Sequence, residues 1–153
     1  MRNIKNQHQM NYSLILISIT ILFFSSFARG QEAFICIPSA RTGFAVNDAT
    51  KKWEVTRFSI NEDKKILKKI NAKWEWRKFG DKGGYSDCNN RADTNSKDGF
   101  NSAGFIFCEV LGGSMRMSKK SLRYIETYEI GFFDGIDKNA DTPMIEMGTC
   151  SPL

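Results

Sequence analysis

Hydrophobic and polar residues alternate along much of the chain, and the segment Ser121–Phe133 shows this pattern most clearly. Its apolar parity consists of Leu122, Tyr124, Tyr128, Ile130 and Phe132, with Glu126 as the interruption. A period of two over this length is typical of a strand that turns one face toward a core. A helix here would have to contain Gly131, two tyrosines and a threonine, which favour strands or turns. We therefore predict a long strand.

The same reading predicts further short strands separated by turn residues. They are Phe34–Ile37, Gly43–Val46, Trp53–Ile60, Trp74–Phe79, Phe105–Val110, Ser114–Ser118 and Pro143–Cys150. Pro38 is expected to end the first strand, and a change of phase near Thr56-Arg57 predicts a bulge in the third. Because Phe105–Val110 is almost continuously apolar, we expect it to be buried on both faces. Asp134–Thr142 is predicted to be a polar loop.

The segment Asn61–Lys73 fits either of two structures. It begins with an asparagine and two acids and continues with lysines, and three apolar residues between 66 and 70 are spaced for one helical face. In the alternative, Asn61–Asp63 form a hairpin turn and Lys65–Lys69 form the returning strand. We predict the strand, because the segments on either side also favour strands.

Short strands, short connections and a lack of crossover helices predict an all-β protein with an antiparallel meander of seven or eight strands. Closure into a barrel would remove the exposed edge strands of such a sheet. We therefore predict a small up-and-down barrel of lipocalin-like size. A two-sheet β-sandwich is the alternative.

The first thirty residues predict an export signal. The polar stretch up to residue 13 carries Arg2 and Lys5 but no acid, an eleven-residue apolar run follows over Leu14–Phe24, and small residues come next. A helix of eleven residues spans about half of the hydrocarbon core, so we expect no retained membrane anchor. Cleavage is predicted after Ala28 or Gly30. The remaining residues, 31–153, are predicted to form one periplasmic or secreted domain.

Removal of this segment changes the charge and the available chemistry. Arg2, Lys5 and Arg29 leave and no acid does, so the net charge falls from +5 to +2. His8, the single histidine, leaves as well. Catalytic Ser-His-Asp and Cys-His arrangements and histidine-containing zinc or iron sites are thereby excluded. We expect no metal and no cofactor, and we favour binding over catalysis.

Four cysteines remain, Cys36, Cys88, Cys108 and Cys150. An even number in an exported chain indicates two disulfides, and the C-x-x-C spacing of redox and zinc motifs is absent. Three pairings are possible. We predict Cys36–Cys150, which would tie the two ends of the mature chain together, and Cys88–Cys108, which would close a loop of about twenty residues.

Aromatic side chains supply the candidate ligand-binding residues. They are Trp53, Trp74, Trp76, Tyr124 and Tyr128. Inside a small barrel, such rings either fill the interior or surround a ligand. Glu126 belongs to the same face of its strand. A buried carboxylate has a raised pKa and can be functional, unless it pairs with a nearby arginine or reaches the rim. Glu146 is expected to face inward with Met144.

A basic stretch runs from Lys64 to Lys82 with aromatic residues between its charges. Such a stretch can bind polyanions or single-stranded nucleic acid. For an exported protein of net charge +2, a solvated face is the better interpretation, and we expect no nucleic-acid partner.

Two acidic stretches resemble the start of a calcium-binding loop. In the first, Asp137, Asn139 and Asp141 alternate, but the required glycine and final glutamate are missing; in the second, Asp93–Gly99, a lysine stands at a ligand position. We interpret both as polar turns.

A further set of residues is spread over most of the mature chain. It comprises Gly43-Phe44, Trp53, Phe58, Leu122-Arg123-Tyr124, Tyr128, Gly131, Asp141-Thr142-Pro143, Ile145-Glu146, Gly148 and Cys150. In this combination the chain resembles a group of small exported bacterial proteins. The resemblance implies export and a single domain, and it implies no catalytic residues.

Three functions fit these features. The first, which we favour, is a non-catalytic binding protein whose barrel interior or rim recognises a small molecule or a cell-envelope fragment. It requires a cavity with aromatic walls. The second is a protein inhibitor or interaction module acting on an exported hydrolase, which requires a filled interior and a protruding loop, with Gly80–Asn101 as the candidate. The third is a hydrolase with paired carboxylates, for which the sequence nominates no pair. We expect a monomer.

Overall fold

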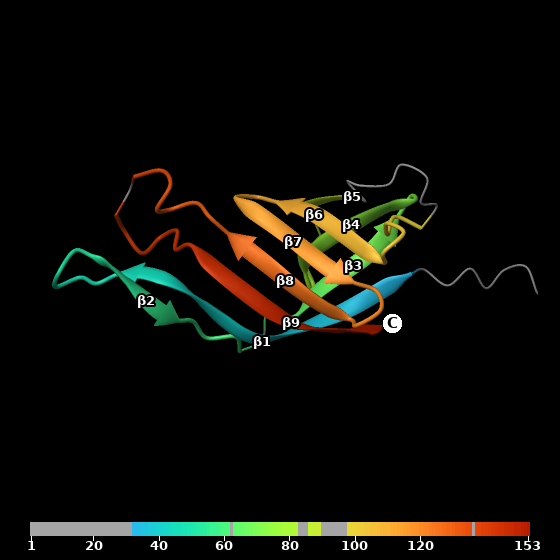
Figure 1. Cartoon of the computed structure of the whole chain (residues 1–153), viewed down its shortest axis with the longest axis horizontal. Helices are drawn as coiled ribbons and strands as arrows, with labels where there is room; N and C mark the ends of the chain where they lie inside the picture. Colours follow the sequence, from blue (N-terminus) through green and yellow to red (C-terminus); the bar gives the residue numbers. More distant parts are fainter. Residues whose placement is uncertain (1–31, 62, 83–85, 90–97, 136) are drawn as a thin grey trace, which may run out of the picture. The chain divides into compact units, whose positions relative to one another are not determined.

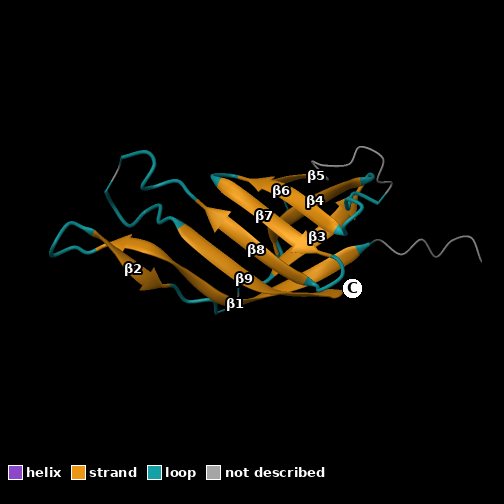
Figure 2. Ribbon diagram, viewed as in Figure 1, coloured by secondary structure: helices purple, strands orange, loops and turns teal. Residues whose placement is uncertain are grey.

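The computed structural model describes residues 32–61, 63–82, 86–89, 98–135 and 137–153. The predicted signal peptide lies outside these ranges, whereas residues 31–153 form one compact unit. The regular elements in the described ranges are all strands (Figure 2), and no helix suited to crossing a bilayer occurs there. The strands are β1 Ala33–Val46, β2 Trp53–Arg57, β3 Lys65–Ile70, β4 Lys73–Lys78, β5 Ser86–Asn89, β6 Phe105–Val110, β7 Gly113–Ser118, β8 Arg123–Tyr128 and β9 Met144–Pro152.

The strands form one antiparallel meander that curls into a small barrel (Figure 1). Their order is β2-β1-β3-β4-β5-β6-β7-β8-β9, and β1 also pairs with β9, so the ladder of pairings returns to its start. The ladder between β4 and β5 is short, and its described pairing is Trp74 with Cys88. The predicted all-β meander is confirmed, and the two-sheet alternative is not adopted.

Strand β1 closes the barrel because it has partners on both sides. Its first residues, Ala33–Cys36, pair with β3, its last five pair with β2, and most of its length pairs with β9. The sequence predicted two strands separated by Pro38, which was wrong. The strand continues because the register shifts between Pro38 and Ala40, and a bulge tolerates a residue without an N–H donor.

Both predicted disulfides are confirmed. Cys36 bonds to Cys150, and Cys88 bonds to Cys108. In each case the two cysteines lie directly opposite each other on neighbouring strands, β1 with β9 and β5 with β6. The first disulfide therefore fastens the seam at which the barrel closes. Two disulfides indicate an oxidising compartment outside the cytoplasm.

The segment Asn61–Lys73 forms a strand, as predicted. Lys65–Ile70 pairs with Lys73–Lys78, and the two residues between them, Asn71 and Ala72, have φ angles of 49° and 67°. Two left-handed residues in a two-residue connection match the right-handed twist of the strands that they join. The helical alternative loses because its apolar residues, including the fully buried Leu67, serve one wall of the barrel.

Three other predictions about the strands were wrong. The long strand of Ser121–Phe133 is limited to β8, because Leu122 adopts a left-handed φ of 55° and the chain turns away after Tyr128. No bulge lies near Thr56-Arg57, where β2 pairs regularly with β1 and then ends. Strand β6 is buried on one face, since Ile106 and Cys108 point inward while Phe105 is 42% exposed.

The region Gly80–Asn101, predicted as a protruding loop, contains strand β5. Within it, residues 83–85 and 90–97 lie outside the described ranges. The part that projects from the barrel among the described residues is a different one. In Figure 1, the β1–β2 hairpin and the segment between β8 and β9 both extend to the left beyond the other strands. We call β2, residues 42–52 and the described residues 129–135 and 137–143 the arm.

Candidate functional site

The aromatic residues predicted to line a cavity instead pack together in the barrel interior. Trp74, Trp76 and Tyr124 are each 2% exposed, and the rings of Trp76 and Tyr124 have centroids 5.0 Å apart. Trp74 lies 5.5 Å from Phe100 and 5.9 Å from Phe34. These rings fill the space that a ligand inside the barrel would need.

Of the other two predicted aromatic residues, Trp53 belongs to the arm, and Tyr128, the last residue of β8, bonds to it. Trp53 donates a hydrogen bond from Nε1 to Asp137 Oδ1 at 2.7 Å, and the Tyr128 hydroxyl donates to Asp141 Oδ1 at 2.8 Å. The hydrogen bond to Asp141 raises the pKa of Tyr128 above its ordinary value. The six residues predicted to form one binding site therefore occupy two separate places.

A network of charged side chains closes one part of the barrel interior. Glu146 is fully buried, accepts a hydrogen bond from the Tyr124 hydroxyl at 2.8 Å and forms two contacts with the Arg41 guanidinium, one from Nε at 2.8 Å. Arg41 also donates to Asp63 at 2.7 Å and to the Ser59 carbonyl at 3.1 Å. Glu146 faces inward as predicted, and Arg41 satisfies its charge.

The network shifts several pKa values in directions that keep its members charged or bonded. Burial alone lowers the pKa of Arg41, but hydrogen bonds to Glu146 and Asp63 outweigh burial and leave it raised. Burial, reinforced by the bond to Glu146, raises the pKa of Tyr124. Burial pushes the pKa of Asp63 upward, but hydrogen bonds from Arg41 and Lys78 outweigh this and hold it below its ordinary value.

Glu126 lies directly opposite Glu146 on the neighbouring strand, and it is 8% exposed. Its charge is met by Lys65, whose Nζ lies 3.1 Å from Oε2, so its cationic partner is a lysine and not the arginine considered from the sequence. Two adjacent carboxylates are the equipment of a glycosidase. Here, however, Glu146 is fully buried and bonded to Arg41 and Tyr124. The carboxylate of Glu146 is therefore not exposed to a substrate in this structure.

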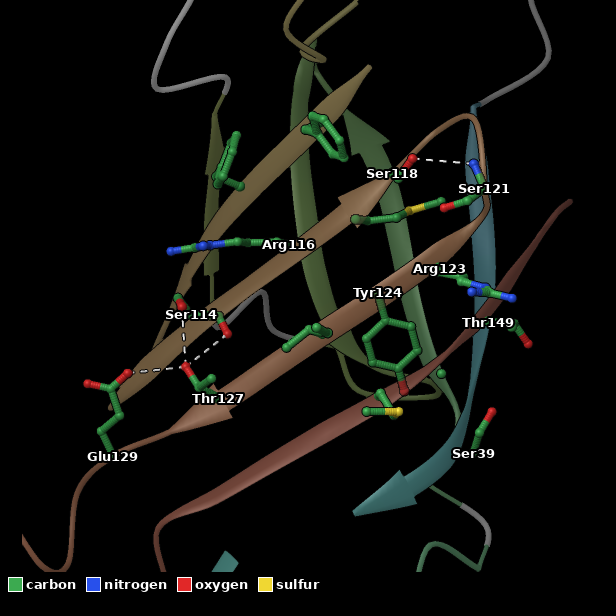
Figure 3. A pocket seen from close by; sticks show the side chains of 16 residues that line it. Ser39, Ser114, Arg116, Ser118, Ser121, Arg123, Tyr124, Thr127, Glu129 and Thr149 are labelled. Atoms are coloured by element: carbon green, nitrogen blue, oxygen red, sulfur yellow. Dashed lines mark hydrogen bonds between the residues drawn. The ribbon is translucent and has the colours of Figure 1, made fainter. Parts of the chain in front are cut away.

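A groove of about 880 Å³ lies on the outer face of strands β6–β9 (Figure 3). Strand register arranges its side chains in two parallel rows. The first row is Phe105, Ser118, Arg123 and Thr149, and the second is Phe107, Arg116, Ile125 and Met147. Ile125 and Met147 are 47% and 50% exposed. The apolar side chains of these rows therefore come from β6, β8 and β9, whereas β7 contributes Arg116 and Ser118.

The cationic groups of the groove have no acidic partner in the described part of the chain. Among the described residues, neither Arg116 nor Arg123 forms an ion pair, and Arg116 lies over the ring of Phe107 at 5.7 Å. The acid that lines the groove, Glu129, lies at its opposite end and accepts a hydrogen bond from Thr127. The Arg123 end is thus locally positive.

The arm is held together by the polar residues that resemble a calcium loop. Asp137 and Asp141 accept the hydrogen bonds from Trp53 and Tyr128 described above. Asn139 binds the Val46 backbone twice, accepting from N at 2.7 Å and donating to O at 2.8 Å. The three side chains therefore fasten residues 137–141 to strands β1, β2 and β8, which supports their interpretation as structural turn residues.

Metal binding gains no support from the described residues. No group of three or more histidine, cysteine, aspartate or glutamate side chains gathers there in a way that could hold an ion. Most of the second calcium-like stretch, Asp93–Gly99, lies outside the described ranges.

Sequence reasoning missed the residues that carry charge in the site. Arg41 lies between the two strands that the sequence predicted on either side of Pro38. No inward position was therefore assigned to it. Arg116 and Arg123 alternate with apolar residues in the sequence, which is typical of the outward face of a strand, but nothing in the sequence shows that they share one groove. Only the register of the paired strands reveals that the two arginines are neighbours.

Comparisons with protein-family models, with curated proteins and with solved structures give no match for this chain.

Proposed function

We propose that the mature chain is an exported, non-catalytic interaction module that binds another exported protein through the arm. The observation that carries this proposal is a pair of adjacent phenylalanines at an anchored loop. Phe132 and Phe133 are 64% and 87% exposed, although the residues around them are fastened to the barrel. The first partner class to test is an exported hydrolase.

The filled barrel interior supports a protein partner over a small ligand held inside. A lipocalin-like binder needs an internal space, and here that space holds Trp74, Trp76 and Tyr124. An interaction module needs a solid scaffold and an exposed contact segment, and the chain has both.

The anchoring of the arm supports a binding role because it prepares the loop for contact. Phe44 N donates to the Pro143 carbonyl at 3.0 Å, and Trp53 packs edge-on against Phe132 with centroids 5.8 Å apart. At Gly131, which has a φ of 105°, a Cβ atom would collide with the Asp141 carbonyl, so the two halves of the loop lie in direct contact. A loop ordered before binding loses less entropy on association.

The chemistry of the arm indicates what kind of surface it fits. Exposed Phe133, Phe44 and Val55 supply apolar contacts, and Val55 is 75% exposed. Residues 129–141 contain four acids, at positions 129, 134, 137 and 141, and the single base Lys138. The partner proposed is therefore a protein with an apolar cleft and a positive rim, located in the periplasm or outside the cell.

The test begins with capture of partners from an extracytoplasmic extract on the immobilised mature domain, followed by calorimetry with the purified partner. Phe133→Ser is expected to weaken binding by about tenfold or more, as for an aromatic hot spot. Leu111→Ser is the matched control, because Leu111 is 78% exposed on the β6–β7 turn. Equal binding by wild type and Phe133→Ser would refute the role of the arm.

A further inference from the structure

We infer that the groove on β6–β9 is a separate site for a small anionic amphiphile, a molecule with one carboxylate or phosphate group and a hydrocarbon chain. This inference is independent of the proposed function of the arm, with which the groove shares Glu129 at its far end. It rests on the juxtaposition of unpaired positive charge, free hydroxyl groups and exposed apolar side chains on one face of the sheet.

The Arg123 end of the groove offers donors suited to an anion. Figure 3 shows Arg123 and Thr149 near Ser121 and Ser39 at one side of the groove. Arg123 and Thr149 are direct cross-strand partners, and all four residues are exposed. In the described part of the chain, none of these four side chains forms a hydrogen bond or an ion pair with another residue. A planar guanidinium with several N–H groups binds carboxylate and phosphate oxygens with two parallel hydrogen bonds.

The middle of the groove offers the apolar surface that a hydrocarbon chain needs. Ile125 and Met147 face each other across β8 and β9 in the row next to Arg123. Phe105 begins the row of Arg123 itself, and Phe107 begins the row of Ile125, with Arg116 between them. Covering these half-exposed side chains would remove apolar area from water, which favours binding in proportion to that area.

The size and the charge distribution select the class of ligand. A volume of about 880 Å³ lies within the usual range of small-molecule sites, roughly 300–1,000 Å³. A purely apolar ligand would leave the guanidinium of Arg123 unused. A ligand with charges at both ends would bring its second anion to Glu129, which lines the far end of the groove. A ligand with one anionic head and an uncharged tail places the head at Arg123 and brings no second charge to Glu129.

The experiment uses the oxidised mature domain with octanoate and octyl phosphate below their micelle concentrations, observed by NMR of methionine methyl groups. The mature chain has four methionines, and Met147 lies in the groove whereas Met115 is fully buried on the other side of the wall. Saturable shifts of the Met147 methyl signal with either probe are expected, and the Met115 signal serves as an internal control. The relative affinity of the two probes distinguishes a carboxylate ligand from a phosphate ligand.

Matched variants test the two halves of the site. Arg123→Gln is expected to weaken octanoate binding by about tenfold, because one charge-assisted interaction is lost. Arg57→Gln, an exposed arginine at the end of β2, is expected to change nothing. Octyl glucoside, which has the same tail and no charge, is expected to bind wild type and Arg123→Gln equally weakly. An unshifted Met147 signal, equal octanoate affinity of Arg123→Gln and wild type, or binding to phosphatidylglycerol vesicles without binding to either free probe would overturn the inference.

Discussion

Glu126 and Glu146 lie directly opposite each other on β8 and β9, with both side chains buried in the barrel. Like charges in this position repel, so each carboxylate requires its own cation. Arg41 serves Glu146 and Lys65 serves Glu126, and the two cations come from β1 and β3. The two ion pairs that offset this repulsion therefore connect β8 and β9 to β1 and β3.

Replacement of Arg41 by methionine is expected to destabilise the mature domain by about 3–5 kcal/mol, because the buried Glu146 would lose its cationic partner. Urea unfolding of the oxidised protein measures the change. Arg116→Met on the outer face is the control and should stay within about 0.5 kcal/mol of wild type. The double variant Arg41→Met with Glu146→Leu should recover part of the loss, since no unpaired charge remains. A loss below about 1 kcal/mol for Arg41→Met would contradict this account of the network.

Asp63 is expected to make stability depend on pH in the acid range. Its folded pKa is lowered, despite the opposing effect of burial, by hydrogen bonds from Arg41 and Lys78. The unfolded carboxyl has a pKa of about 3.9, so below that pH the unfolded chain binds the proton first. The contribution of Asp63 is therefore complete above about pH 4 and is lost as the pH falls through its folded pKa.

The matching experiment compares wild type and Asp63→Asn by urea unfolding at pH 7 and at pH 3. Wild type should be the more stable protein at pH 7, and the difference should shrink at pH 3. Asp48→Asn, in the exposed turn between β1 and β2, is the control for loss of a surface acid. If the stability difference between wild type and Asp63→Asn grew on acidification, this would contradict the stabilisation of ionised Asp63 by Arg41 and Lys78.

Removal of the two disulfides should have unequal effects. The Cys36–Cys150 bond joins residues 114 apart in sequence, and Cys88–Cys108 joins residues 20 apart. On the chain-entropy model these bonds contribute about 4–5 and about 3 kcal/mol. The double serine variant at 36 and 150 is therefore expected to lose more stability than that at 88 and 108. Thermal unfolding of both variants checks the order, and the reverse order would show that native-state contacts outweigh loop entropy.

Ala72→Gly is expected to stabilise the β3–β4 hairpin by about 0.5–1 kcal/mol. Alanine at a φ of 67° is strained by its Cβ atom, and glycine removes that strain at a smaller cost in unfolded-chain entropy. Ala72 is exposed, so the substitution sacrifices no packing. Ala103→Gly is the matched control: Ala103 is also an exposed turn residue, without a positive φ, and the change should destabilise. Equal effects of the two substitutions on the urea midpoint would contradict the argument.

The sequence predicted most strands of the barrel correctly, but it did not predict the short strand β5 or the bulge at Pro38. Alternation in Trp74–Phe79 and Ser114–Ser118 identifies strands because one face of each meets the core, as the burial of Trp74, Trp76 and Met115 confirms. Strand β5 escaped notice because its four residues contain one apolar residue, Cys88, whose inward position is recognisable through its disulfide. Pro38 misled the prediction because a bulge suits a residue that cannot donate a hydrogen bond.

The candidate sites were less accessible to sequence reasoning, and the reason is geometric. Trp53 and Trp74 look alike in the sequence. Trp53 nevertheless belongs to the arm, which projects from the barrel, whereas Trp74 belongs to the core. The groove depends on four strands in register, and Arg123 meets Thr149 only when β8 and β9 are paired. A hydrophobic pattern identifies which face of a strand is buried, but not which side chains become neighbours on the other face.

The hydrogen bond from Leu153 N to the Ala33 carbonyl, 2.9 Å long, brings the two ends of the folded domain together. The chain is therefore suited to circular permutation, with residues 153 and 32 joined by a linker of about four residues and new termini opened between Lys51 and Lys52. In such a permutant every strand could keep its partners. The bond between Cys36 and Cys150, however, would then close only a short loop, and most of its entropic benefit would disappear while the native contacts stayed the same.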